Sequence, residues 1–384
     1  MIRAADKWLP GYLASAWSRP RVPEGTVHVM VCMADHFEPF QRSIAPDGTI
    51  SGGRPRDEAA TLVREWCAGH RESVAGVEDS DGVPPRHTFF YPQDEYDEEC
   101  VDILAGLCRE GFGEIEVQVH HRNDTADGLR IKLEEYRDVL HERHGVLGED
   151  AGGKARYGFV HGNWCLCNSR PDGDWCGVNE ELTVLAGTGC YADFTFPSAP
   201  SPTQPRTVNT IYRAVDRAGR PRGHDQGEPV TAGQGPELPD SHTPTPPAPH
   251  TPAPLLLIPG PLALDWRRRK FGVLPRLDTA AITGMNPPSP GRVDLWLRQH
   301  IHVRGRPEWV FLKAHTHGCV PENRTVLFGE AMRGMHRHVG ERAECFVHYV
   351  TAREMHNIIR AAEDGNAGNP GDFRDYEIAR PVGR

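Results

Sequence analysis

The stretch that decides the fold reads Gly113-Glu114-Ile115-Glu116-Val117-Gln118-Val119 and continues directly into His120-His121-Arg122-Asn123-Asp124. Apolar and polar residues alternate over 113–119, which predicts a strand with one buried face. Residues 127–144 follow with apolar side chains at helical spacing. A strand that passes through a polar turn into a helix is the building unit of a parallel sheet or barrel.

The same unit recurs on both sides of this stretch. Upstream, the pattern predicts strands at 27–33 and 86–91 and helices at 56–68 and 95–110. Downstream, it predicts a helix at 179–186, a closing helix at 352–364, and strands at 157–161, 191–196, 255–258, 292–297 and 309–312. We therefore predict an α/β fold with parallel strands.

Residues 218–254 interrupt this alternation. Eight of the nineteen residues from 236 to 254 are proline, and Thr, Ser, His and Ala stand between them. Such a segment buries little apolar surface, so we predict a disordered insertion or linker. The two flanking parts, 1–217 and 255–384, are expected to form one barrel domain.

The overall composition argues against several classes of partner. The net charge is -10 with only five lysines, so nucleic acid is not expected. No apolar run reaches the roughly 20 residues of a membrane span. Residues 1–20 carry charges and lack the continuous apolar core of a signal peptide, which predicts a cytoplasmic protein. The ten cysteines lack a disulfide framework and are expected to be buried thiols. The oligomeric state stays open.

Polar clusters follow four of the predicted strands: Asp35-His36, His120 to Asp124, His161-Gly162-Asn163 and His315-Thr316-His317. Reactive residues of parallel sheets and barrels gather at the carboxyl ends of strands. Two ligands four positions apart, together with a distant Asp, would make a three-ligand metal site with open positions. For Asp35-His36 alone, a metal ligand and a solvated loop are equally good interpretations. One histidine of the last cluster is expected to act as a general acid.

Two further motifs are interpreted as structural. Cys165, Cys167 and Cys176 lack the spacing of a zinc ribbon, so a structural zinc is not expected there. Arg353-Glu354 opens the last predicted helix and is expected to form structural ion pairs.

The order of these clusters resembles the polysaccharide deacetylase (NodB-homology) superfamily, and most closely an uncharacterised bacterial deacetylase-like group. The matching segments span most of the chain outside 218–254 and are 34–39, 87–92, 113–117, 159–164, 190–200, 313–318 and 348–354.

The resemblance implies a distorted (β/α)7-type barrel that carries one divalent ion. The implied metal ligands are Asp35, His120 and Asp124, and His121 is a further candidate. Zinc would be the usual ion, with iron, manganese or cobalt as alternatives. The superfamily usually has His where this chain has Asp124, and a first acidic residue where it has Ala34.

The activity implied is hydrolysis of a C–N bond, an N-acyl or amide group, on a carbohydrate or related small molecule. His36 or Glu38 would act as the base, and His315 or His317 would protonate the leaving amine. The substrate wall would consist of His161, Asn163 and Trp164. Two alternatives stay open: metal-dependent C–N or oxidative chemistry on a small specialised metabolite, and a non-catalytic scaffold of a polysaccharide-assembly system.

Overall fold

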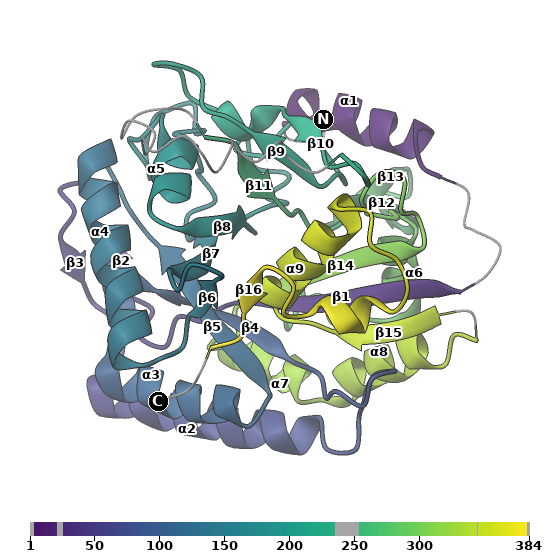
Figure 1. Ribbon diagram of the computed structural model, residues 1–384, viewed down its shortest axis with the longest axis horizontal. Helices are drawn as coiled ribbons and strands as arrows, with labels where there is room; N and C mark the ends of the chain where they lie inside the picture. Colours follow the sequence, from purple (N-terminus) through teal and green to yellow (C-terminus); the bar gives the residue numbers. More distant parts are fainter. Residues whose placement is uncertain (1–3, 21–25, 235–252, 344, 382–384) are drawn as a thin grey trace.

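The computed structural model describes residues 4–20, 26–234, 253–343 and 345–381. Its centre is a sheet of parallel strands (Figure 1): β1 (Val27–His36), β4 (His87–Pro92), β5 (Gly113–Val119), β7 (Ala155–His161), β8 (Cys190–Asp193), β11 (Leu255–Leu257), β14 (Trp309–Thr316) and β15 (Cys345–Tyr349). The predicted α/β class with parallel strands is therefore confirmed.

Short antiparallel strands extend this sheet at its margins. They are β9 (Tyr212–Ala214), β10 (Glu228–Pro229), β6 (Gly148–Asp150) and β16 (Ile378–Ala379). The main hydrogen-bonded path then runs β10-β9-β11-β8-β7-β5-β4-β1-β14. Two hairpins lie outside it, β2 (Ser43–Ile44) with β3 (Ile50–Ser51) and β12 (Ala263–Lys270) with β13 (Leu274–Asp278).

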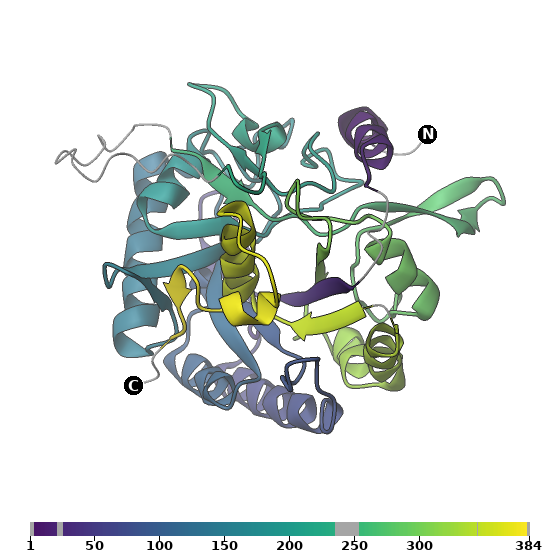
Figure 2. The same cartoon turned by 45° about the vertical axis from the view of Figure 1, so that its right-hand side comes forward.

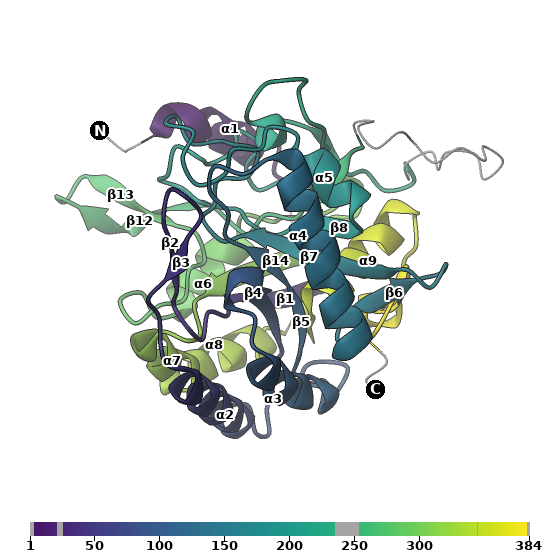
Figure 3. The same cartoon turned by 90° about the vertical axis from the view of Figure 1, so that its left-hand side faces the viewer.

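Helices connect many of the strands, and the five helices predicted from the sequence are among them. They are α1 (Ala5–Trp17), α2 (Arg56–Ser73), α3 (Glu98–Arg109), α4 (Ala126–Asp138), α5 (Glu181–Gly187), α6 (Pro290–Leu297), α7 (Pro321–Leu327), α8 (Glu330–Gly340) and α9 (Ala352–Glu363). Helices α2, α3 and α4 lie along one side of the sheet (Figure 3), and their apolar side chains share one core cluster with β4, β5 and β7. None of the helices described is long and apolar enough to cross a membrane.

Strand β1 is buried on both faces, which explains its continuous apolar run. Side chains alternate between the two faces of a strand. Val29, Val31 and Met33 pack in one core cluster with α6 and α8, whereas Met30 and Cys32 pack in another with α9. Along its edges, β1 pairs with β14 over its length, with β15 near its start and with β4 near its end.

Two predictions about elements are wrong. Residues 292–297 belong to helix α6, where Ser289 and then Pro290 at the first helical position mark a helix start. Residues 218–234 are ordered: a short 3-10 helix spans Gly223–Asp225 and β10 follows it. The guanidinium of Arg222 donates to the carbonyl oxygens of Ser169, Pro202 and Gln204, and thereby ties this segment to the domain. The rest of the expected insertion, 235–252, lies outside the described residues.

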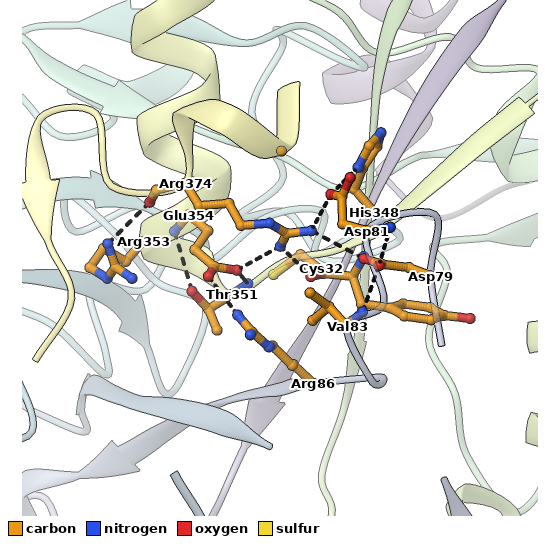
Figure 4. Close-up of polar contacts among 12 residues, drawn as sticks. Cys32, Asp79, Asp81, Val83, Arg86, His348, Thr351, Arg353, Glu354 and Arg374 are labelled. Carbon is orange, nitrogen blue, oxygen red and sulfur yellow. Dashed lines mark hydrogen bonds and ion pairs between the residues drawn. The ribbon is translucent and has the colours of Figure 1, made fainter. Parts of the chain in front are cut away.

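An ion-pair network lies before the amino end of β4 and beside the start of α9 (Figure 4). Glu354 accepts from Arg86 at 2.5 Å and from Arg374 at 3.1 Å. Arg374 also donates to Asp79 and Asp81, at 3.1 and 3.0 Å. Arg353 pairs separately with Glu114 at 2.7 Å. The structural role predicted for Arg353-Glu354 fits these contacts.

The hairpin β12–β13 projects from the body of the molecule, to the right in Figure 2. Its outer part carries exposed apolar side chains, at Trp266, Phe271, Val273 and Leu274. The same strands carry the basic run 267–270.

Candidate active site

Polar side chains gather at the carboxyl ends of the parallel strands, as the sequence pattern predicted. One group surrounds His120, which follows β5. Its Nδ1 lies 2.9 Å from Oδ1 of Asp94, and its Nε2 lies 3.5 Å from Oε1 of Glu38. Gln118 Nε2 donates to the same oxygen of Glu38 at 2.7 Å. His120 thus bridges two carboxylates that come from the ends of β1 and β4.

This arrangement favours charge on both partners. Burial disfavours the charged form of His120, but Asp94 and Glu38 outweigh it and raise its pKa to about 10. Burial likewise raises the pKa of Glu38, but His120 and His317 outweigh burial and the net pKa lies below its ordinary value. His120 is therefore an imidazolium at neutral pH, hydrogen-bonded to Asp94 and close to an ionised Glu38.

A second group adjoins the first. Donor atoms of His36, Glu38 and His317 all lie within 4.8 Å of one another. The rings of His36 and His317 stack with their centroids 4.7 Å apart. Trp164 stands edge-on to both, with centroid distances of 5.9 and 6.0 Å. Two nitrogens and one carboxylate with an apolar wall beside them make a ligand set that leaves coordination positions open.

The donor set fits a divalent ion on further grounds. His36 is buried, and its Nδ1 has no hydrogen-bond partner. Burial and the neighbouring histidines His317 and His315 lower its pKa well below the ordinary value. The ring is therefore neutral at physiological pH, and a neutral imidazole is the form that ligates a metal.

The structure does not bring the expected set Asp35, His120 and Asp124 around one point. Asp35 is fully buried, where it accepts from Gly318 N at 2.6 Å and contacts Nδ1 of His87 at 3.1 Å. Asp124 lies beyond the turn and pairs with Lys132 Nζ at 2.7 Å. The spacing argument assumed a helix over 120–124, but the helix begins only at Ala126.

His120 and His121 face opposite ways, as consecutive residues of an extended segment do. His121 is buried with His161, Cys176 and Glu181, whose donor atoms also lie within 4.8 Å of one another. Its Nε2 lies 3.3 Å from Oε1 of Glu181. Burial lowers the pKa of His121, but Cys176, Asp124 and Glu181 outweigh it and raise the pKa well above its ordinary value. His161 therefore belongs to this second cluster and not to the wall that Trp164 forms.

The remaining expected residues lie nearby in two different settings. His315 lies near the end of β14, two residues before His317, and burial with the charge of Lys313 lowers its pKa to about 3. Asn163 lies between the two clusters, and its backbone N–H donates to Nδ1 of His161 at 3.2 Å.

A third group of donor atoms belongs to Asp79, Asp81 and His348. The positive charge of Arg374 already balances the aspartates of this group. The guanidinium of Arg374 donates to both aspartates, and His348 Nδ1 lies 2.8 Å from Asp81 (Figure 4). A cation would have to displace Arg374, so this group has a structural role.

The sequence analysis missed Asp94, Glu181 and the pair Asp193 and Lys313. Asp94 follows strand β4 at its carboxyl end, so the strand-end rule would have found it. Burial raises the pKa of Asp193 to about 7 and lowers that of Lys313 to about 8, and Lys313 Nζ donates to Phe196 O at 2.6 Å. For Glu181, inside a helix, the sequence offers no comparable signal.

No protein-family model matches the chain, and no curated protein matches it by sequence. Among solved structures, it is similar to the crystal structure of 4-alpha-glucanotransferase from Thermococcus litoralis, with a TM-score of 0.37 and 8% identity. The match covers 84% of this chain and 39% of that chain, so this chain spans well under half of that enzyme's length. A likeness this distant supports no functional argument.

Proposed function

We propose that the protein is a divalent-metal-dependent hydrolase that cleaves an N-acyl or amide C–N bond, with His36, Glu38 and His317 as the metal ligands. The observation that carries this is the convergence of the three donor groups beside the hydrogen-bonded pair His120 and Asp94. The deacetylase-like substrate class, a carbohydrate or related N-acylated small molecule, comes from the sequence resemblance. The distorted barrel of that superfamily and the cytoplasmic location remain predictions with it.

A divalent ion at this place supplies Lewis-acid polarisation of an acyl oxygen and activation of water. Zinc suits two imidazoles and one carboxylate, and iron, manganese and cobalt accept the same donors.

Proton transfer falls in this proposal to His120. Asp94 holds Nδ1 of the ring, and Nε2 lies 3.5 Å from Oε1 of Glu38, one of the three proposed ligands. An imidazolium in this position can protonate the leaving amine as the C–N bond breaks. The sequence analysis had assigned this role to His315 or His317. Trp164 offers an apolar face on which a sugar ring can stack.

The test separates ligands from the proton donor. We expect Glu38→Gln and His317→Ala to lose one equivalent of metal, measured by elemental mass spectrometry, and to lose hydrolysis. His120→Gln should keep the metal and lose about 10²–10⁴-fold in kcat. His141→Ala, which removes a partly exposed histidine outside the site, is the matched control. Hydrolysis is followed as acetate release from N-acetylated amino sugars and their oligosaccharides.

Three results would redirect the assignment. Retention of all metal by Glu38→Gln and His317→Ala would refute the ligand set. A stoichiometric iron that undergoes redox change without acetate release would favour oxidative chemistry on a small metabolite. Protein that takes up neither zinc, manganese nor iron would favour the non-catalytic scaffold.

A further inference from the structure

We infer that His121, His161, Cys176 and Glu181 form a second, closed metal site that holds a structural zinc-type ion. The four residues come from three places in the chain: the turn after β5, the end of β7, and the segment 162–181 that ends in the first turn of α5. All four are buried, and the proposed catalytic ligands contribute none of them.

The two nitrogen–oxygen separations in this cluster are longer than good hydrogen bonds and close to the ligand separations of a coordination sphere. His121 Nε2 and His161 Nε2 lie 3.3 and 3.9 Å from Oε1 of Glu181, and Cys176 Sγ lies 3.3 Å from Oε2 of the same side chain. Good hydrogen bonds between nitrogen and oxygen span about 2.7–3.2 Å. Bonds of about 2.0–2.3 Å in a tetrahedron place neighbouring ligand atoms roughly 3.3–3.8 Å apart.

An unpartnered nitrogen points into the cluster. Nε2 of His161 is buried and has no hydrogen-bond partner. Because Asn163 N donates to Nδ1, the neutral ring carries its proton on Nε2, where no acceptor satisfies it. Ion binding would move that proton to Nδ1, turn the Asn163 N–H away and give Nε2 a ligand bond. A buried polar atom without a partner is costly, so its presence needs an explanation.

The charges and the surrounding contacts also suit a divalent ion. One thiolate and one carboxylate neutralise two positive charges, which leaves no net charge in a dry interior. Nδ1 of His121 is buried without a hydrogen-bond partner and lies 3.4 Å from Asp124 Oδ2, a carboxylate placed to orient the ring once that nitrogen carries the proton of a ligating imidazole. Cys167 N donates to Oε2 of Glu181 at 2.6 Å and fixes the carboxylate.

Four protein donors leave no position for a substrate, which is the mark of a structural site. The ion would fix segment 162–181, which also carries Trp164 of the candidate active site. Several residues there adopt left-handed backbone, among them Trp164, Cys167 and Trp175, with φ of 55, 51 and 66°. Such conformations cost free energy and persist only where the surroundings hold them.

The experiment measures zinc stoichiometry and the absorption of the cobalt(II) protein. We expect Cys176→Ala to lose one equivalent of zinc after reconstitution and dialysis. We expect cobalt(II) wild type to show thiolate-to-cobalt charge-transfer absorption in the near ultraviolet, and Cys176→Ala to lack it. Cys167→Ala is the matched control, because Cys167 is a buried cysteine of the same segment and its thiol is no member of the cluster.

Wild-type cobalt protein without the charge-transfer band, or Cys176→Ala with the band unchanged, would overturn the inference. The wild-type spectrum decides the question even if the variant does not fold. The experiment tests the two proposed metal sites independently. Loss of metal only in His317→Ala would refute this second site. Loss of metal only in Cys176→Ala would refute the proposed catalytic ligands.

Discussion

Gly162 shows how one missing side chain sets the position of His120. A Cβ at Gly162 would lie 2.3–2.4 Å from ring atoms of His120, so no larger residue fits while the ring keeps its place. We expect Gly162→Ala to push the ring away from Asp94 and Glu38 and to lower kcat by tenfold or more, with metal content unchanged. Kinetics and elemental analysis of the same preparation check this.

Gly106→Ala in α3 is the control for that substitution. A Cβ at Gly106 meets no atom within 4 Å, so the change should leave kcat intact and add up to about 1 kcal/mol of stability. Unchanged kcat in Gly162→Ala would mean that the position of His120 does not matter for the reaction.

At the residue scale, the sequence predicted where the candidate site lies but not which residues meet in it. The rule that strand ends carry chemistry singled out His36 and His317, whereas Glu38 was expected only from the resemblance, as a base. Cys176 and Glu181 lie far from His121 in sequence and off any strand. Only the packing of segment 162–181 against the turn after β5 brings them together, and no local pattern encodes that packing.

Among the elements, α9 depends on one carboxylate with several partners. Glu354 completes the capping box with Thr351 and pairs with Arg86 and Arg374. Glu354→Gln would leave the largely buried guanidinium of Arg86 without this carboxylate and would leave Arg374 with Asp79 and Asp81 alone. We expect a loss of about 3–5 kcal/mol in the free energy of unfolding, measured by urea denaturation.

The exposed Glu341→Gln at the end of α8 is the comparison for that measurement, with an expected change within about 0.5 kcal/mol. Equal stabilities of the two variants would mean that the network around Arg374 contributes nothing net.

Element types followed from periodicity wherever an element was long. The helix α6 was misassigned because Val293 and Leu295 alternate with Arg292 and Asp294, which imitates the period of a strand over a short stretch. Ser289 followed by Pro290 is a typical helix start and would have indicated the helix. The segment 218–234 was misassigned because its order comes from Arg222 and its three carbonyl partners, which are contacts with distant residues.

For the molecule as a whole, a buried acid predicts a pH dependence of stability. Burial raises the pKa of Glu116 from 4.5 to about 8, against the hydrogen bonds from Tyr191 and Gly158 that lower it. Between these values the folded protein holds a proton that the unfolded chain has lost. The stability that this proton provides is complete below pH 4.5 and is lost as the pH rises towards 8, by up to about 1.4 kcal/mol per unit.

We expect Glu116→Gln, which cannot ionise, to lack this part of the dependence. The unfolding free energy of the wild type should therefore fall by about 2–3 kcal/mol relative to that of the variant as the pH rises from roughly 5.5 to 7.5. Urea denaturation of both proteins at the two pH values gives the difference directly. A constant difference would contradict the raised pKa.

The alternation of strands and helices predicted the parallel sheet, but not the order of strands within it. Strand order depends on which apolar faces meet, and several strands here are almost uniformly apolar. The sequence did not predict that β1 lies between β4 and β14, because a strand so uniformly apolar would suit any interior position of the sheet.

That position of β1 governs when the protein can fold. Residues 28–35 pair with 309–316 and the start of the strand pairs with 345–349, so the ribosome makes these partners long after β1. Until then the apolar strand β1 lacks its partners β14 and β15, and unpaired strand edges favour aggregation. Pairings so distant in sequence also slow the search for the native arrangement. Nascent chains should therefore need chaperones most until residues 309–349 have been synthesised, and slow expression at low temperature should raise the soluble yield.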